Sequence, residues 1–412
     1  MTQTTYLQFD GLKNPVALDN AARLVPMISE VLAGWPHTAS PVCQSQPFVT
    51  IRPSAGDYWS ISLGEAPSDL RDWNAVNAVC DLVAEMAWER LRSDPTLLCL
   101  HAAAVAFDGR LVVFPNARRA GKSTIAAALG QLGHKIYTDD FLPVRTDPES
   151  RTFHGIANGV VPRIRLPLPE SFSDAFQAWV QQDPGPSNKQ YKYLSTAPVA
   201  PGGETMPLGA VVVLERQDDP TEPLLEVIPR ADALASLITQ NFARTQLSGA
   251  ILNATDVLTH HLPLYRLTYH NGEQAAQFLA NHPALHALPT AKSSAVDPAL
   301  KQAPLEMLGQ PSPQFMRACP YVQAAGLTET KVGHDHFLAD SNGLAIYRLN
   351  AGSVAIWNVL KEPANLDEVI EILMAAFEDV ATTQIATDSE DLMRSLVAAQ
   401  LIVPARAEVA VR

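Results

Sequence analysis

The chain has 412 residues, of which 47% are hydrophobic and 18% are charged, a composition that supports two or three cored domains and excludes a disordered protein. Thirty Lys and Arg residues stand against 43 Asp and Glu residues, which gives a formal net charge of −13. Because affinity for nucleic acid comes largely from basic residues that displace counterions, this balance argues against a nucleic-acid partner.

The cysteines and the N-terminal segment bear on the cellular compartment. The four cysteines are widely spaced and form no C-x-x-C pair, so the sequence indicates neither a zinc site nor a disulfide framework. The first residues lack a basic and then apolar signal segment, and no apolar run approaches the ~20 residues of a membrane helix. We therefore expect a soluble, cytoplasmic protein with free thiols and no membrane partner.

The N-terminal part alternates between strand and helix patterns. Residues 48–52 and 58–63 alternate like two strands around a Pro/Gly turn, and Val76 to Leu91 carries apolar residues at helical spacing. No catalytic motif occurs there, and its aromatic and apolar positions are expected to form core.

The next segment predicts a hairpin that leads to a loop. Apolar residues fill Leu97 to Phe107, and Asp108-Gly109 separates them from a second apolar run at 111–114. His101 is expected on the strand beside the loop. A lone histidine in an apolar run is more often a core residue than a functional one, so its role depends on its neighbours.

The loop that follows has the features of a phosphate-binding loop between a strand and a helix. Its pattern is close to G-x-x-x-x-G-K-[ST], with Asn116 in place of the first glycine. Asn tolerates the left-handed conformation better than most residues. In such loops the backbone N–H groups and the helix N-terminus bind phosphate oxygens, with Lys122 placed for the β- and γ-phosphates and Ser123 for Mg²⁺. The alternative is an ordinary basic loop. The predicted nucleotide-binding residues here are Asn116, Ala120, Gly121, Lys122, Ser123 and Thr124.

A pair of acidic residues comes one helix and one strand later. Gly133 is placed to end the helix, 135–138 reads as a strand, and Asp139-Asp140 follows. One carboxylate can help to hold Mg²⁺ while the other accepts the proton of an attacking hydroxyl, and the proximity of like charges raises one pKa. A solvated Asp-Asp turn is the alternative reading.

Two later segments are candidates for contact with substrates. Arg163 and Arg165 alternate in Pro162–Pro167 and would share one face of an extended segment, where they could bind phosphate or simply face solvent. The Pro/Gly/Asn-rich segment 183–190 is expected to be an unpacked, mobile substrate loop. Further on, 208–215 and 264–269 read as strands, with a helix over 231–242 between them.

Composition divides the chain into residues 1–287, a linker over 288–313 that is rich in Pro, Ala, Ser and Lys, and a small unit over 314–405. The small unit shows a hairpin around 340–343 and three helices that begin near Asn350, at Asn365 with Glu368, and at Thr387 with Glu390. This pattern predicts a winged-helix-like α+β module. Residues 313–412 carry seven basic and 13 acidic side chains, a balance of −6 that disfavours DNA binding.

The motifs of the first part resemble HPr kinase/phosphorylase and its relatives, the serine kinases of the phosphoenolpyruvate-carboxykinase-like fold. The matching features are His101 before the loop, the Gly-Lys-Ser-Thr loop, and Gly133-His134-Lys135 leading to the paired Asp. The resemblance implies an α/β P-loop kinase domain over residues 1–287 that uses ATP and Mg²⁺. Lys122 and Ser123 would contact both, Asp139 would be the general base, Asp140 its metal or orienting partner, and His101 would lie near the transferred phosphate. Because the arginine segment 162–167 replaces that family's Glu-containing Gly-rich signature, HPr itself is disfavoured as the substrate.

The small unit resembles the PqqD family, the peptide chaperone of pyrroloquinoline-quinone synthesis and the recognition element of many enzymes that modify ribosomal peptides. The matching run is Leu349-Asn350-Ala351-Gly352-Ser353-Val354-Ala355-Ile356-Trp357, followed by two amphipathic helices. The resemblance implies a RiPP recognition element over 314–405 that binds an extended leader peptide as an added strand.

Together these features predict an ATP-dependent kinase that phosphorylates a Ser or Thr hydroxyl of a ribosomal precursor peptide whose leader the C-terminal unit captures. The alternative is a nucleotide-binding scaffold or pseudokinase that presents the peptide to another enzyme, and Asn116 with the replaced signature motivates it. A weaker alternative is that the phosphate is only a leaving group for later elimination, or that the enzyme also removes it. The sequence leaves a homo-oligomer open.

Overall fold

A computed structural model describes residues 4–64, 71–116, 119–147, 151–241, 247–289, 314–340 and 345–405. The chain divides into two compact units, residues 1–243 with 257–297 and residues 244–256 with 298–412. Both contain helices and sheets, so the predicted α/β class is confirmed. Most of the expected linker, 290–313, lies outside the described residues. Among the described helices, none combines the length and apolar character needed to span a bilayer.

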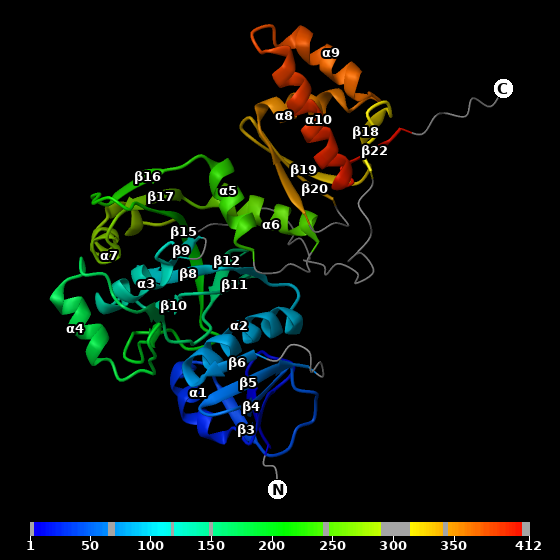
Figure 1. Cartoon of the computed structure of the whole chain (residues 1–412). Coiled ribbons are helices and arrows are strands. Elements are labelled where there is room, and N and C mark those ends of the chain that lie inside the picture. The colour runs from blue at the N-terminus through cyan, green and yellow to red at the C-terminus, as the bar shows by residue number, and fades with distance from the viewer. Residues whose placement is uncertain are drawn as a thin grey trace. The chain divides into compact units, whose positions relative to one another are not determined.

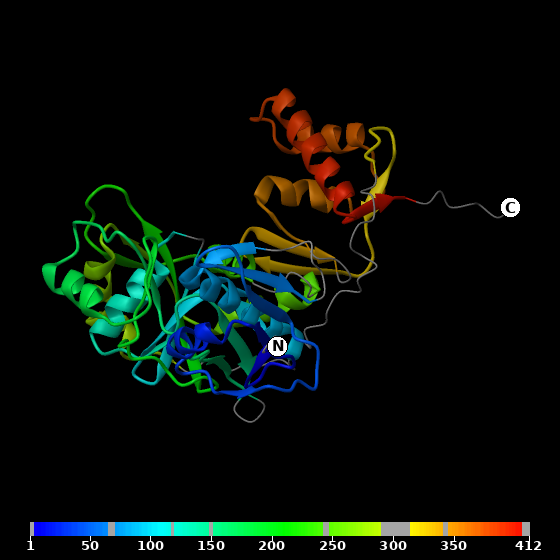
Figure 2. The same ribbon diagram turned by 60° about the horizontal axis from the view of Figure 1, so that its bottom comes forward.

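The N-terminal part of the first unit is a sheet covered by helices α1 (Val25–Val31) and α2 (Ala75–Ser93), drawn in blue in Figures 1 and 2. Its strands run in the order β3-β1-β2-β4-β5-β6. They are β1 (Thr4–Phe9), β2 (Val16–Asp19), β3 (His37–Ser40), β4 (Val49–Pro53), β5 (Tyr58–Leu63) and β6 (Arg71–Asn74). Apolar residues of α1, α2 and the sheet form one core. The predicted strands at 48–52 and 58–63 and the helix at 76–91 are confirmed by β4, β5 and α2.

A second, mixed sheet forms the centre of the first unit and continues the order β10-β8-β9-β15-β12-β11-β7, with β17 beside β15 and β16 beside β17. Strands β9, β15 and β17 are parallel to one another. The nine strands are β7 (Leu98–Leu100), β8 (Ala102–Phe107), β9 (Arg110–Pro115), β10 (Ile136–Thr138), β11 (Leu142–Thr146), β12 (Phe153–Ile156), β15 (Thr205–Arg216), β16 (Leu224–Val227) and β17 (Leu264–Tyr269).

Helices flank this sheet (Figure 1), and a two-stranded hairpin contacts helix α3 (Lys122–Gln131). The other flanking helices are α4 (Asp174–Gln182), α5 (Arg230–Thr239) and α7 (Gly272–Ala280), and the hairpin is β13 (Arg163–Arg165) with β14 (Tyr191–Tyr193). Helix α6 (Ser248–His261) contains the boundary between the two units, at residues 256 and 257. Helix α3 is apolar on nearly every side because it contacts β8, β10, β13 and α7. Its alanines at 126–128 are buried, as expected of small residues that let these elements approach closely. As predicted, the turn after α3 uses Gly133, which has φ +93°.

Three glycines join the N-terminal sheet to the rest of the first unit by direct backbone contact. Gly34 N–H donates to the Gly159 carbonyl at 2.9 Å, and the Gly34 carbonyl accepts from Gly202 N–H at 2.6 Å. A Cβ on Gly34 would lie 2.8 Å from Gly159 Cα, closer than real side chains come. Gly159 follows Asn158, whose side chain donates to the Thr138 hydroxyl in the turn that carries Asp139 and Asp140. The N-terminal part therefore supports that turn.

Segment 183–190 is packed, and the expectation of a mobile, unpacked loop is wrong. The Asp183 carboxylate accepts hydrogen bonds from Gly185 N, from Ser195 N, and from both the backbone and the hydroxyl of Thr196. The Asn188 side chain donates to Asn74 and Asn77 at the start of α2. Hydrogen bonds from side chains to backbone groups hold this segment in place. Its Pro, Gly and Asn content alone indicated only that it forms no regular helix or strand.

Two predicted element boundaries differ from the structure. The apolar run 97–107 is two strands instead of one: β7 pairs with β11 and β8 with β9 and β10, with a break at His101, whose N–H donates to the Gln240 carbonyl at 2.7 Å. The last helix of the chain begins at Thr382 instead of Thr387. The Thr387 hydroxyl donates to the Thr383 carbonyl, as a threonine inside a helix does, so it is not the N-cap.

The second unit has a three-stranded antiparallel sheet, a two-stranded sheet and a cluster of helices. These elements are β18 (Tyr321–Gln323), β19 (Leu327–Val332), β20 (Asp335–Asp340), β21 (Ile346–Leu349), α8 (Ala351–Val359), α9 (Leu366–Ala376), α10 (Thr382–Ala398) and β22 (Ile402–Pro404). Strand β20 lies between β19 and β21, and β18 pairs with β22. The predicted caps are confirmed: Asn350 caps α8, and Asn365 with Glu368 forms a capping box for α9. The predicted hairpin is also present, although its turn at 341–344 lies outside the described residues.

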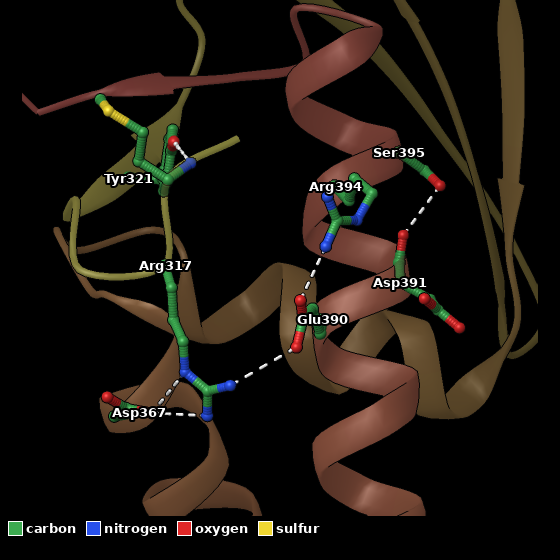
Figure 3. A network of polar contacts seen from close by, with 8 residues as sticks. Arg317, Tyr321, Asp367, Glu390, Asp391, Arg394 and Ser395 are labelled. Carbon is green, nitrogen blue, oxygen red and sulfur yellow. Dashed lines mark hydrogen bonds and ion pairs between the residues drawn. The ribbon is translucent and has the colours of Figure 1, made fainter. Parts of the chain in front are cut away.

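An arginine near the start of the second unit links two of its helices (Figure 3). Arg317 donates to Asp367 on α9 at 2.9 Å and lies 3.5 Å from Glu390 on α10. Glu390 in turn pairs with Arg394, whose guanidinium lies 5.4 Å from the centre of the Phe315 ring. These side chains are partly exposed, so each pair contributes only modestly to stability, and together they connect α9 with α10.

The glycine junction predicts opposite effects for two Gly→Ala substitutions. In Gly34→Ala the new Cβ meets the backbone of Gly159, and we expect a loss of about 1–3 kcal/mol in the free energy of unfolding. Gly352→Ala is the matched control, since the nearest atom to its Cβ, in helix α8, is 3.7 Å away and Ala favours helix. Chemical unfolding followed by circular dichroism measures both. Equal stability of Gly34→Ala and the wild type would contradict the contact.

Candidate active site

Asn116 occupies the position directly after β9 and connects the loop to two neighbouring groups. Its side-chain amide donates to the Leu214 carbonyl on β15, and its backbone carbonyl accepts from Lys122 Nζ at 2.5 Å. The residue that replaces the usual first glycine therefore ties the start of the loop to the adjacent parallel strand. Residues 117 and 118 lie outside the described residues.

The second half of the loop turns sharply into α3. Gly121 has φ +90°, a conformation that favours glycine, and it precedes the first residue of the helix. Lys122 is 7% exposed, so its ammonium lies within the loop instead of in open solvent. The loop thus combines a helix N-terminus, a glycine turn and an inward-pointing lysine, the elements of an anion-binding site.

Tyr269, the last residue of β17, holds the loop from the side. Its hydroxyl donates to the Ala120 carbonyl at 2.6 Å. A Cβ on Gly121 would lie only 2.2 Å from the same hydroxyl, so glycine is required here both by the backbone angle and by the tyrosine. Sequence reasoning missed Tyr269, because a tyrosine that ends a buried strand looks like an ordinary core residue.

The two acidic residues follow β10 in a turn that is fixed by hydrogen bonds. The Thr138 hydroxyl accepts from the backbone N–H groups of Asp140 and Phe141, at 3.1 and 3.2 Å, and from the Asn158 side chain at 3.0 Å. Asn158 also donates to the Phe141 carbonyl, and it is 4% exposed. Neither Thr138 nor Asn158 carried a sequence signal, yet they determine where the acidic pair points.

Asp139 is buried, with 6% exposure. Burial, with the neighbouring charge of Asp140, raises the pKa of Asp139 to about 6, although hydrogen bonds from Arg163 N–H and the Ser123 hydroxyl act in the opposite direction. Ser123 is the second residue of α3, so the buried carboxylate lies directly against the start of the phosphate-type loop.

Asp140 has a different environment. Its side chain is 40% exposed, and its Oδ1 lies 3.2 Å from His101 Nε2. Desolvation acts to raise its pKa, but the hydrogen bond and charge of His101, with the charges of Arg163 and Lys122, outweigh it and lower the pKa of Asp140. Adjacent carboxyl groups therefore differ in exposure and in proton affinity, and His101 lies against one of them.

The two predicted arginines share a face and both approach the Tyr191 ring, at 4.7 Å for Arg163 and 5.7 Å for Arg165. The Arg163 guanidinium also hydrogen-bonds to Cys80, which accepts a hydrogen bond from the Tyr193 hydroxyl at 3.2 Å. Burial acts to lower the pKa of Arg163, but its neighbours outweigh this and raise it. Arg163 is thus part of the acidic-pair cluster, whereas Arg165 is exposed and has no described contact with that cluster.

These groups suit a bound triphosphate with one divalent cation. Mg²⁺ in such sites is held by one or two protein groups, with phosphates and water supplying the rest. Ser123 and Asp139 lie together and fit that role. Within the described part of the chain no three His, Cys, Asp or Glu side chains form a metal-binding group. The described residues bring together Lys122, Ser123, Asp139, Asp140, His101 and Arg163.

A surface cavity of about 720 Å³ lies elsewhere in the first unit, along α7. Gln274, Phe278 and His282 line it, with Glu222 and other residues of the β15–β16 connection and the end of α7. None of the residues described above lines this cavity, so we do not place the chemistry there.

In the second unit the candidate binding element is the edge strand β21. It pairs with β20 on one side, and no other described strand pairs with its second side. Leu349 is buried, while Ile346 and Tyr347 are half-buried. Trp357 on α8 is 2% exposed in the core, and its carbonyl accepts from the Gln323 side chain at 2.7 Å. A rigid helical core therefore supports an open strand edge, the arrangement that an added peptide strand requires.

Comparison with known proteins identifies part of this unit. Residues 335–402 match the family model described as Coenzyme PQQ synthesis protein D (PqqD), which confirms the predicted resemblance for that segment. No curated protein matches the chain. Among solved structures, the Hpr(Ser) kinase/phosphatase from Coxiella burnetii is similar over 45% of this chain and 95% of its own, with 12% identity and a TM-score of 0.23. At this TM-score the likeness supports no statement about activity.

The buried Asp139 predicts a substitution that stabilises the fold. Its pKa is raised in the folded state, so the ionised form costs stability, increasingly as pH rises from 4 to above 6. Asp139→Asn removes that charge and should raise the free energy of unfolding at pH 8 by about 3 kcal/mol, the equivalent of a shift of about two pKa units, with the gain disappearing toward pH 4. Asp140→Asn should instead destabilise at pH 8, because its ionised form is favoured by folding. Denaturant titrations at the two pH values test both signs; a less stable Asp139→Asn at pH 8 would exclude the burial argument.

The contact between Gly121 and Tyr269 predicts a rescue. Gly121→Ala places a methyl group against the Tyr269 hydroxyl and should abolish nucleotide binding at the loop. Tyr269→Phe removes that hydroxyl and leaves the next ring atom 3.4 Å away, so the double variant should recover part of the binding. Tyr269→Phe alone should weaken binding several-fold, through loss of one hydrogen bond of about 1 kcal/mol. Calorimetric titration with ATP and Mg²⁺ measures all three variants, and equal binding by Gly121→Ala and the double variant would contradict the contact.

Proposed function

We propose that the chain is an ATP-dependent kinase that phosphorylates a Ser or Thr hydroxyl of a ribosomally synthesised precursor peptide. The observation that carries the proposal is the meeting of two differently ionised carboxylates with the first turn of α3: Asp139 accepts from Ser123, and Asp140 pairs with His101. A glycine-turn loop with an inward lysine next to paired carboxylates supplies what transfer of a phosphoryl group to a hydroxyl needs.

The contacts favour roles for Asp139 and Asp140 opposite to those implied by the family resemblance, in which Asp139 is the general base. Asp139 is buried against Ser123, and we assign it to the side of the Mg²⁺ ion. Asp140 is 40% exposed and oriented by His101, so it is the carboxylate that an incoming hydroxyl can reach. Its low pKa is compatible with this role, because a loose phosphoryl-transfer transition state demands little proton abstraction.

ATP and Mg²⁺ supply the transferable phosphoryl group and its charge neutralisation when bound. In this proposal residues 116–124 form a P-loop: Lys122 binds the β- and γ-phosphates, the backbone of Ala120 and Gly121 faces phosphate oxygens, and Thr124 continues the helix start. Arg163, already engaged by Cys80 and Tyr191, holds the acidic turn, and the exposed Arg165 remains available for the phosphate or the acceptor.

The PqqD-like unit supplies the peptide. We propose that residues 314–405 form a winged-helix-like recognition element, that residues 1–287 form the kinase domain, and that a leader peptide adds to the free side of β21. Tethering the leader makes the transfer step effectively intramolecular, so even a weakly bound acceptor is modified at high local concentration.

The second candidate is a nucleotide-binding scaffold that presents the peptide to another enzyme. The specific observation behind it is Asn116, whose carbonyl already accepts from Lys122 Nζ. If that bond persists with nucleotide present, Lys122 is withheld from the phosphates and turnover is lost while binding survives.

The kinase proposal predicts a mass gain. Incubation of the full chain with ATP, Mg²⁺ and the candidate precursor peptide encoded beside its gene should add one phosphate to the peptide, detected by mass spectrometry. Asp140→Asn should lose the transfer by about two to four orders of magnitude with nucleotide affinity unchanged, whereas Asp139→Asn should also raise the Mg²⁺ concentration required. Since both carboxylates must be ionised, the rate should fall as pH drops through about 6.

Glu222→Gln, at the separate cavity along α7, is the control and should leave the rate unchanged. A peptide that binds, together with ATP that binds, and no mass gain at any pH would overturn the kinase proposal in favour of the scaffold.

A further inference from the structure

Arg216 lies at the carboxyl end of β15, and no sequence pattern indicated a function for it. Arg216 is the last residue of β15, and in the parallel ladder it lies opposite Tyr269, the residue whose hydroxyl holds Ala120. Two residues earlier on β15, the Leu214 carbonyl accepts from the Asn116 side chain. Arg216 therefore lies at the end of β15, two residues beyond one loop-holding contact and opposite the residue that makes the other.

The face on which Arg216 lies follows from strand alternation. Val212 and Leu214 on β15, and Leu267 and Tyr269 on β17, belong to the core shared with α3 and α7. Residue 216 continues the same face beyond the last core residue. Its side chain therefore begins at the carboxyl ends of the parallel strands, the same end of the sheet at which α3 starts. Ligands of α/β sheets bind at this end.

Arg216 also differs from its neighbours in having no partner. Its side chain is exposed and makes no ion pair or hydrogen bond with any residue that the structure describes, although its backbone belongs to the ladder with β17. Arg266 on β17, by contrast, belongs to the opposite face and pairs with Glu215 at 3.1 Å. Arg216 is thus an exposed cation at the end of β15, and no described acidic side chain pairs with it.

We propose that Arg216 binds the triphosphate of the nucleotide held by residues 116–124. The inference rests on the proposed function and adds a residue to that site. A guanidinium presents several donors in a planar fork and forms strong charge-assisted bonds with phosphate oxygens. In the sheet order β15 lies on one side of β9, and β10, which precedes the acidic pair, lies on the other, so Arg216 would supply a positive charge on the side of the loop away from Asp139 and Asp140.

The charge of Arg216 already reaches this part of the loop. Burial raises the pKa of Tyr269, and the positive charge of Arg216 acts against that rise. Arg216 thus lies close enough to affect the charge state of the hydroxyl that bonds to Ala120.

The test compares two arginines on adjacent strands. Arg216→Gln should raise the Kd for ATP with Mg²⁺ about 10- to 100-fold, the range expected for a lost charged hydrogen bond, whereas Arg266→Gln should change it less than twofold. Inorganic triphosphate, which lacks base and ribose, should show the same ratio, and Arg216→Lys should fall between. Thermal unfolding should be the same for both variants, since both side chains are at least partly exposed.

The outcomes distinguish a failure of the Arg216 proposal from a failure of the proposed kinase function. Wild-type binding with an unaffected Arg216→Gln overturns the role of Arg216 and leaves the kinase proposal standing. A loss for ATP but not for triphosphate also overturns it, because the contact is then with base or ribose. Failure of the wild type to bind either probe, with Lys122→Ala as the reference for a lost site, contradicts the proposed function itself.

Discussion

The hydrogen bonding of one long strand, β15, determines most of the candidate active site. Its first residues pair with β12, and its later residues run between β9 and β17 in parallel. Because β9 and β17 both pair with β15, the Asn116 side chain reaches the Leu214 carbonyl, and the Tyr269 hydroxyl reaches Ala120. The loop is therefore held by contacts from β15 and β17, and Arg216 is the last residue of β15. Asn116 in place of glycine fits this arrangement, because its side chain makes the bond to β15.

The acidic pair illustrates how adjacent residues with the same side chain acquire different chemistry. Asp139 is desolvated, with a raised pKa, and Asp140 is partly exposed and held ionised by His101. The turn that separates them is maintained by Thr138 and Asn158, and Asn158 is backed by the contacts among Gly34, Gly159 and Gly202. The N-terminal part thus supports the site through Gly34 and through Cys80 on α2, which hydrogen-bonds to Arg163. Such a buried, partly charged cluster costs stability, as functional sites commonly do.

Sequence patterns predicted the parts of the fold and site that depend on local chemistry. Period-2 and helical spacing located β4, β5, β17 and α2, and capping residues located α8 and α9. The Gly-Lys-Ser-Thr run and Asp139-Asp140 predicted a cluster of residues that the fold brings together. The sequence could not reveal contacts between distant segments. Tyr269, Asn158 and Arg216 look like ordinary core or surface residues until the sheet brings them together. Segment 183–190 looked unpacked because its order comes from the Asp183 carboxylate and the Asn188 amide, not from hydrophobic periodicity.

The central claim is that the PqqD-like unit and the loop with its acidic pair act on one peptide. The most direct test is the rate of phosphorylation of the intact precursor peptide compared with its core segment alone, each at low concentration. We predict that removal of the leader lowers kcat/KM by at least about a hundredfold, in line with the gain that tethering typically provides, and that leader supplied as a separate peptide competes with the intact precursor. Equal kcat/KM for the intact peptide and the bare core would contradict the claim.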